Sequence, residues 1–135
     1  MKTKTLLKII GINLLIFGAL FGLVSFNKEF LRPLSSPNSL SAIFTGCFPN
    51  FIAAYLISLA PINAVIIKKP KRGRMIVYVS AIIVFLILSI EEIIPMWGAS
   101  TYYDLYDIIA SAIGSALAIL TYEIIGRFNT SDYKV

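Results

Sequence analysis

Histidine is absent from this 135-residue chain, and cysteine occurs once, as Cys47. One cysteine cannot form an intrachain disulfide, and without histidine the chain has neither a histidine general base nor the mixed cysteine and histidine ligands of zinc sites. The sequence also has no glycine-rich phosphate loop, serine nucleophile elbow or nucleotide motif. It therefore indicates no catalytic residue, metal site or cofactor, and any chemistry must use carboxylates, hydroxyls, tyrosines, lysines or the backbone.

Charge is also scarce. Charged residues make up 14% of the chain and hydrophobic residues 58%, which is far more apolar than an average soluble domain. The length accommodates about four membrane spans of ~20 residues and leaves no room for a separate soluble domain. We therefore expect an all-α integral membrane protein in which residues 1–135 form one bundle of four transmembrane helices.

Four apolar stretches supply these helices, and we place the spans at residues 9–26, 49–67, 75–97 and 105–125. Residues 9–26 could alternatively be the apolar core of a signal peptide. This core is long and no A-x-A-like cleavage site follows it, so an uncleaved span is favoured. Residues 27–41 contain two prolines and several serines, and this composition predicts a loop.

The second span is complicated by two prolines, Pro49 and Pro61. Because a residue that precedes proline is pushed out of the helical region, the span is expected to begin near Pro49. Residues 42–48 then form an interfacial or re-entrant lead-in. The alternative is one kinked helix that covers residues 42–67.

Positive charge is concentrated next to the apolar stretches. Residues 68–74, KKPKRGR, carry five positive charges and no negative one. A short basic loop between two spans is first of all a cytoplasmic topology signal, ahead of binding to anionic lipid or to nucleic acid. With four spans, ten basic residues fall on the side of this loop, and only Lys28 and Arg32 fall on the other. Both termini are therefore expected in the cytoplasm, and a nucleic-acid partner is not expected.

The acidic residues gather toward the opposite, outer side. They form a candidate polar site with one serine: Glu91, Glu92, Asp104, Asp107 and Ser111. Such carboxylates could hold a divalent cation or share a proton. Adjacent glutamates point about 100° apart on a helix, so at most one of the pair is expected to face the site.

Asp107 is the leading residue of this site, because a carboxylate at the entry of an apolar helix is costly unless it faces a partner, the bundle interior or water. The alternative is that Asp104 and Asp107 cap the fourth helix and interact with its dipole. Capping is favoured over a functional role for Asp104. For Asp107, capping and a functional role both stay open.

Small residues predict close helix packing. Gly18 and Gly22 form a GxxxG pattern in the first span, and Gly114 and Ala118 extend the face that carries Asp107. Close approach of a second helix is the commoner meaning of such patterns. A lipid headgroup or ion between Asp107 and Ser111 is the alternative.

Several polar residues inside the spans are expected to bind neighbouring helices. Glu123 lies near the basic end of the fourth span and is expected to pair with an arginine or lysine. Asn13, Asn50 and Asn63 are candidates for hydrogen bonds between helices, each worth on the order of 1 kcal/mol in lipid.

The acidic and small residues follow an order that is similar to a known motif: Glu91, then Thr101-x-x-Asp104-x-x-Asp107-x-x-x-Ser111-x-x-Gly114-x-x-x-Ala118. It resembles the C-terminal motif of VanZ-like membrane proteins over residues 75–126. In that family an arginine stands at the position of Thr101, an asparagine at Ser111 and a glycine at Ala118. The resemblance implies a small multispan protein of the bacterial cytoplasmic membrane, a family associated in some members with tolerance to lipoglycopeptide antibiotics. It brings no settled catalytic mechanism.

Three functions stay open at this point. The first is a non-enzymatic VanZ-like envelope protein that binds or shields a lipid-linked or cell-wall component at the outer leaflet; its partners would be membrane lipids and a cell-wall precursor or another membrane protein. The second is a small transporter or channel that uses Asp107 and a glutamate as a proton or cation relay. The third is a packing or assembly protein.

Overall fold

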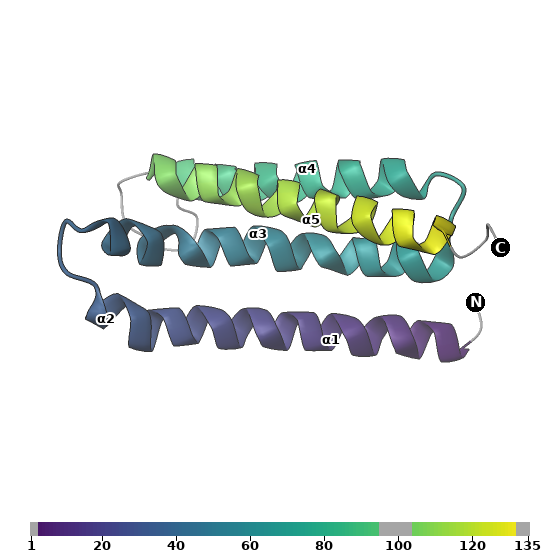
Figure 1. The fold of residues 1–135 in the computed structure, drawn as a ribbon, viewed down its shortest axis with the longest axis horizontal. Helices are drawn as coiled ribbons and strands as arrows, with labels where there is room; N and C mark the ends of the chain where they lie inside the picture. The colour runs from purple at the N-terminus through teal and green to yellow at the C-terminus, as the bar shows by residue number, and fades with distance from the viewer. Residues whose placement is uncertain (1–2, 95–103, 132–135) are drawn as a thin grey trace.

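The computed structural model describes residues 3–94 and 104–131, and over these ranges the chain forms helices and no strand. Four long helices lie side by side along the longest axis (Figure 1). They are α1 (Thr3–Phe26), α3 (Leu40–Lys68), α4 (Gly73–Ile93) and α5 (Leu105–Ser131). Each is part of a segment long and apolar enough to cross a membrane. The expectation of an all-helical chain with four helices able to span a membrane is confirmed over the described residues, and these helices fit a multi-pass membrane protein.

Successive long helices run in opposite directions (Figure 1). The start of α1, the connection between α3 and α4 and the end of α5 therefore lie together, at what we call the basic end. The end of α4 and the start of α5 lie at the other end, which we call the acidic end. As a result α3 and α5 run parallel to each other, and α4 runs antiparallel to both.

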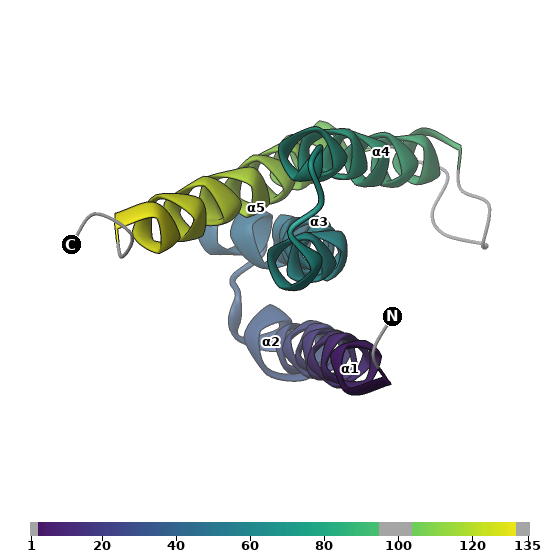
Figure 2. The same ribbon diagram turned by 90° about the vertical axis from the view of Figure 1, so that its right-hand side faces the viewer.

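Helix α3 occupies the centre of the bundle. In the view along the helices, α1 lies on one side of α3, and α4 and α5 lie on the other (Figure 2). Within the described chain, α1 contacts α3 and neither α4 nor α5. The apolar core joins α3 to the α4–α5 pair through the buried side chains Ile62, Val65, Val77 and Ala118.

Gly114 sets the distance between α3 and α5. A Cβ atom built at Gly114 would collide with the carbonyl oxygen of Phe51 and lie 2.9 Å from the Cβ of Ala54. Ala118, one turn further along α5, is fully buried. The packing predicted for Gly114 and Ala118 is confirmed, and it brings the backbones of α3 and α5 together.

The glycines of α1 behave differently. Gly18 and Gly22 are exposed, and open space surrounds both among the described residues. At ~100° per residue they lie on the side of α1 opposite to Ile9, which is buried against the bundle. The expected packing role of Gly18 and Gly22 is therefore not fulfilled within this chain.

The predicted loop over residues 27–41 is largely wrong. The chain stays helical through a π-helical turn, η1 (Asn27–Leu31), and a short helix, α2 (Arg32–Leu34). Pro33 has no N–H and its ring crowds the preceding turn, and the wider π turn just before it accommodates this defect. The rings of Phe26 and Phe30 stack at 5.3 Å across the change in helix type.

A helix start near Pro49 is not what the structure shows. Helix α3 begins at Leu40, where the Ser39 hydroxyl accepts a hydrogen bond from the Ala42 N–H at 3.2 Å. Residues 42–48 are its first turns, so the alternative of one helix over the whole stretch describes the structure. Both Pro49 and Pro61 lie inside this helix.

A side chain from another helix makes Pro49 tolerable. Proline at position 49 leaves the Thr45 carbonyl without its donor four residues on. The Asn27 side-chain amide donates to this carbonyl at 2.8 Å, and Asn27 is fully buried. The Ser35 and Thr45 hydroxyls lie 3.1 Å apart and also join the end of the α1 segment to α3.

The remaining helix limits differ less from expectation. Helix α1 begins at Thr3, before residue 9, and α5 begins at Leu105 as predicted and continues past residue 125. Helix α4 ends at Ile93. The expected end of the third span at Trp97 lies outside the described residues, as do Pro95 and the aromatic residues 102 and 103.

A second polar contact joins α1 to α3. The Asn63 amide donates to the Asn13 side-chain oxygen at 2.9 Å and to the Ile9 carbonyl at 3.4 Å. The interhelical role predicted for Asn13 and Asn63 is confirmed. With the Asn27 contact, α1 is held to α3 by hydrogen bonds at two levels.

Replacing Gly114 by alanine should destabilise the bundle by about 1–3 kcal/mol, because the added Cβ overlaps the α3 backbone. The matched variant Gly18→Ala adds the same atom in open space and should be neutral or stabilise by about 0.5–1 kcal/mol. Thermal unfolding of both variants in detergent checks this. Equal midpoints for the two would contradict the close approach of α3 and α5.

Asn27→Ala should cost about 1–3 kcal/mol, since it leaves the buried Thr45 carbonyl unpaired. In a Pro49→Ala background the same substitution should cost less, because residue 49 then supplies the missing N–H. A double-mutant cycle on unfolding free energies measures the coupling. Asn13→Ala is the control and should cost the same in both backgrounds; an uncoupled cycle for Asn27 would refute the compensation.

Candidate functional site

Two carboxylates at the acidic end organise the start of α5. The Glu92 side chain, from the last turn of α4, accepts a hydrogen bond from the Asp104 N–H at 2.9 Å. Asp104 in turn accepts one from the Tyr106 N–H at 2.9 Å. Both contacts satisfy N–H groups at the helix start that have no partner within the helix. The capping interpretation of Asp104 is therefore confirmed.

Asp107 lies one turn further into α5 and is half-buried. The side chain of Asn50, on α3, lies within hydrogen-bonding reach of the Asp107 carboxylate. The carboxylate oxygen Oδ1 is buried and has no hydrogen-bond partner among the described residues. Asp107 therefore differs from Asp104, because part of its hydrogen-bonding capacity is buried and unused.

Arg32 adds a positive charge to this end of the molecule. Its guanidinium donates to the Gly46 carbonyl on α3 at 3.3 Å. From there its charge acts on the Asp107 carboxylate, as do the charges of Glu92 and Asp104. The acidic end is therefore a mixed-charge cluster, and its arginine comes from a segment that the sequence pattern assigns to a loop.

The structure brings Glu92, Asp104 and Asp107 together and leaves Glu91 exposed. This agrees with the ~100° between adjacent helical residues, which allows one glutamate to face the cluster. Ser111 is buried one turn deeper than Asp107 on the same side of α5. Among the described residues, no three acidic or cysteine side chains are arranged to hold a metal ion.

An apolar groove of about 510 Å³ borders the cluster, between the first turns of α3 and the first turns of α5. Cys47 lines the groove and lies within reach of the charge of Asp107. Tyr106 and Ala110, which flank Asp107 in sequence, line it from α5. Its other lining residues are Leu40, Ile43, Phe44, Phe48, Phe51, Ile109 and Ile113. The half-buried Asp107 carboxylate therefore lies beside the apolar groove.

Buried hydroxyl groups continue from the cluster into the bundle. Ser58, Ser89 and Ser115 are buried, and their hydroxyls have no hydrogen-bond partner among the described residues. Ser58 lies between Ala54, which faces Gly114, and Ile62, which packs with Ala118, so it is level with Ser115.

Ser89 is one turn from Glu92 on α4 and so lies closer to the acidic end. A buried hydroxyl without a partner costs about 1–3 kcal/mol. Buried hydroxyls without partners among the described residues thus occur both near the acidic end and in the middle of the bundle.

At the basic end, by contrast, one carboxylate is paired with an arginine. Arg74 Nε lies 2.8 Å from Glu123 Oε1. The Tyr78 hydroxyl donates to the same oxygen at 3.1 Å, and the Arg74 guanidinium lies 5.6 Å from the centre of the Tyr78 ring. The pairing predicted for Glu123 is confirmed.

Comparison of the chain with protein-family models, with curated proteins and with solved structures finds no match. The VanZ-like resemblance therefore rests on the residues of the sequence alone. Of the positions that carry it, Thr101 lies outside the described residues.

Sequence reasoning missed Arg32 and the contact between Asn50 and Asp107. Arg32 was counted only as a topology signal. Asn50 was recognised as an interhelical hydrogen-bonding group, without a partner. The feature of the sequence that could have indicated this contact is Asn50 itself, a polar residue immediately after Pro49 inside an otherwise apolar stretch.

Asp104→Ala should lower the free energy of unfolding by about 0.5–2 kcal/mol, because it removes the acceptor for the Tyr106 N–H. Asp104→Ser keeps a capping oxygen and should recover most of the loss. Thermal unfolding of the two variants in detergent is the measurement. A serine variant as unstable as the alanine variant would show that the cap is not what Asp104 contributes.

Proposed function

We propose that this chain is a multi-pass protein of the bacterial cytoplasmic membrane, with both termini and the basic end in the cytoplasm. The excess of basic residues on the side of residues 68–74 supports this orientation. The acidic end is then the outer face. Asp107, Asn50 and the apolar groove consequently open toward the outer leaflet and the cell wall.

The function is non-enzymatic: the outer-face site binds or shields a lipid-linked or cell-wall component. The observation that carries this proposal is the half-buried Asp107, whose Oδ1 has no partner among the described residues, beside a 510 Å³ apolar groove. A polar group with hydrogen-bond donors would meet the free carboxylate oxygen, and an acyl or isoprenoid chain would occupy the groove. The polar group would gain a hydrogen bond that bulk lipid tails do not offer, and the groove would fix where the chain lies.

The likeness to VanZ-like proteins gives the proposal its envelope context. The family arginine is replaced by Thr101 here. Arg32 supplies a positive charge near Asp107 from another segment. In this interpretation the chain keeps a carboxylate with a nearby arginine, although the arginine comes from the N-terminal half of the sequence.

Expression of the wild-type chain in a susceptible bacterium should raise tolerance to a lipoglycopeptide, and Asp107→Asn at equal membrane abundance should return tolerance to the level without the protein. The measurement is the minimal inhibitory concentration. Glu91→Gln is the control, because it removes a carboxylate from an exposed position at the same end and should keep the wild-type effect. No effect of the wild type would reject the envelope proposal.

A second candidate function is a proton or cation relay, and the buried serine hydroxyls without partners favour it. Water molecules that enter the bundle from the acidic end would satisfy these groups. Flux through reconstituted vesicles tests it: Asp107→Asn and Ser58→Ala should both reduce flux, and Glu91→Gln should not. If none of the variants changes tolerance or flux and Asp107→Asn alters stability alone, the chain is a packing or assembly protein.

A further inference from the structure

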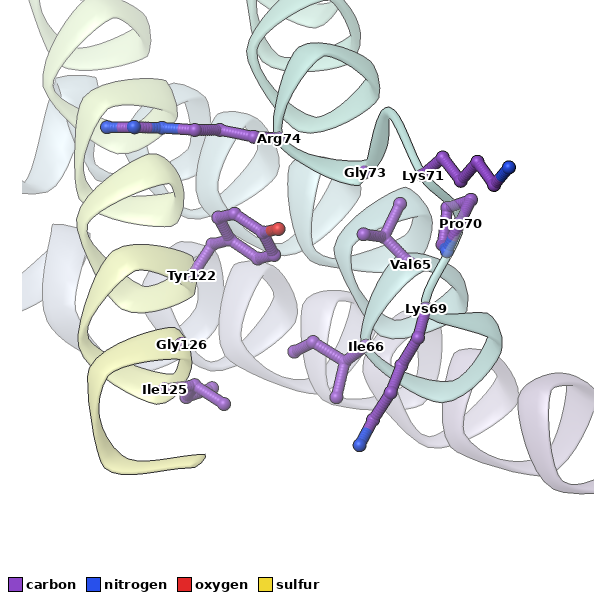
Figure 3. A pocket seen from close by; sticks show the side chains of 10 residues that line it. All are labelled: Val65, Ile66, Lys69, Pro70, Lys71, Gly73, Arg74, Tyr122, Ile125 and Gly126. Atoms are coloured by element: carbon purple, nitrogen blue, oxygen red, sulfur yellow. The ribbon is translucent and has the colours of Figure 1, made fainter. Parts of the chain in front are cut away.

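A cavity of about 350 Å³ lies at the basic end, where the end of α3, the start of α4 and the last turns of α5 meet. Figure 3 shows its residues from close by. Val65 and Ile66 come from α3, Tyr122 and Ile125 come from α5, and the connection with the first turn of α4 supplies the remaining wall. The cavity is separate from the Asp107 cluster, which lies at the other end of the molecule.

The wall of the cavity has two chemical parts. Val65, Ile66 and Ile125 make one part apolar. Arg74 extends along one rim toward α5, and the Lys69 side chain extends on the other side of the apolar part (Figure 3). Lys71 also belongs to the lining but extends away from Tyr122 in this view. The cavity therefore joins an apolar interior to a cationic rim.

The charges at the rim are not equally compensated. Arg74 is neutralised by Glu123 at 2.8 Å. Among the described residues, no carboxylate lines the cavity, and no ion pair involves Lys69. The backbone of Lys69 is fixed: it closes α3 in the left-handed conformation, at φ 47°, with its N–H bonded to the Val65 carbonyl at 2.8 Å. The end of α3 therefore fixes the backbone from which the Lys69 side chain extends at this rim.

We propose that this cavity binds the phosphate headgroup of an anionic phospholipid. The phosphate lies at the rim beside Lys69, and the first part of an acyl chain lies against Ile66 and Ile125. A free phosphate ion would use the same cation but would leave the apolar wall without a partner. The proposal does not depend on the outer-face site, because no residue is shared between the two.

The test uses the purified full chain in detergent, which removes any effect of membrane orientation. Native mass spectrometry measures the dissociation constants of phosphatidylglycerol and phosphatidylcholine. Phosphatidylglycerol should bind more tightly, and Lys69→Gln should weaken its binding about fivefold, as expected for one basic residue near a charged headgroup. Lys68→Gln is the matched control, because Lys68 is exposed, adjacent and outside the cavity lining.

Three outcomes overturn the proposal. Equal weakening by Lys68→Gln and Lys69→Gln would mean that the lipid responds to overall charge and not to this cavity. Equal affinity for the two lipids would remove the role of the anionic headgroup. Inorganic phosphate that displaces phosphatidylglycerol at comparable concentration would identify the ligand as the free anion. Loss of selectivity in Lys69→Gln with wild-type selectivity in Lys68→Gln establishes the site.

Discussion

The Thr45 carbonyl has no amide donor within its own helix, because the residue four positions later is Pro49. In a bilayer an unsatisfied backbone group costs several kcal/mol. The buried side-chain amide of Asn27 supplies the missing donor, while its own Oδ1 is buried without a partner among the described residues. The same contact ties the end of the α1 segment to α3, and it places Arg32 where its guanidinium reaches the Gly46 carbonyl. A defect in the central helix thus determines where the N-terminal segment docks, and with it the positive charge at the acidic end.

Gly114 performs the corresponding task on the other side of α3. Because it lacks a side chain, α5 approaches the α3 backbone at Phe51. Two turns earlier in α5, Asp107 consequently lies against Asn50. The candidate site therefore depends on two tertiary contacts, one for each neighbour of α3. The acidic residues at the end of α4 and the start of α5 would not form it without these two contacts.

Composition and hydropathy predicted the class of protein and the number of long helices, because both depend on the energy of transfer into lipid. The spacing of Asp107, Ser111, Gly114 and Ala118 also predicted the buried side of α5, since helical periodicity is local. Residues 27–34 and 42–48 were assigned wrongly, because local rules for proline do not include a donor supplied from another helix. Arg32 could not be assigned to the site for the same reason, since its neighbours are fixed only by the docking of α1 on α3.

Asp104 and Asp107, at the start of α5, show that a carboxylate does not belong to the site merely because it lies at the acidic end. Asp104 is exposed and its side chain completes a helix cap, so its charge is already used by the fold. Asp107 has Asn50 within hydrogen-bonding reach, and its Oδ1 is buried without a hydrogen-bond partner among the described residues. Keeping such an oxygen beside an apolar groove is costly, and a hydrogen-bond donor that reaches it would offset this cost. The unused capacity of Asp107, more than its charge, therefore makes it the centre of the proposed function.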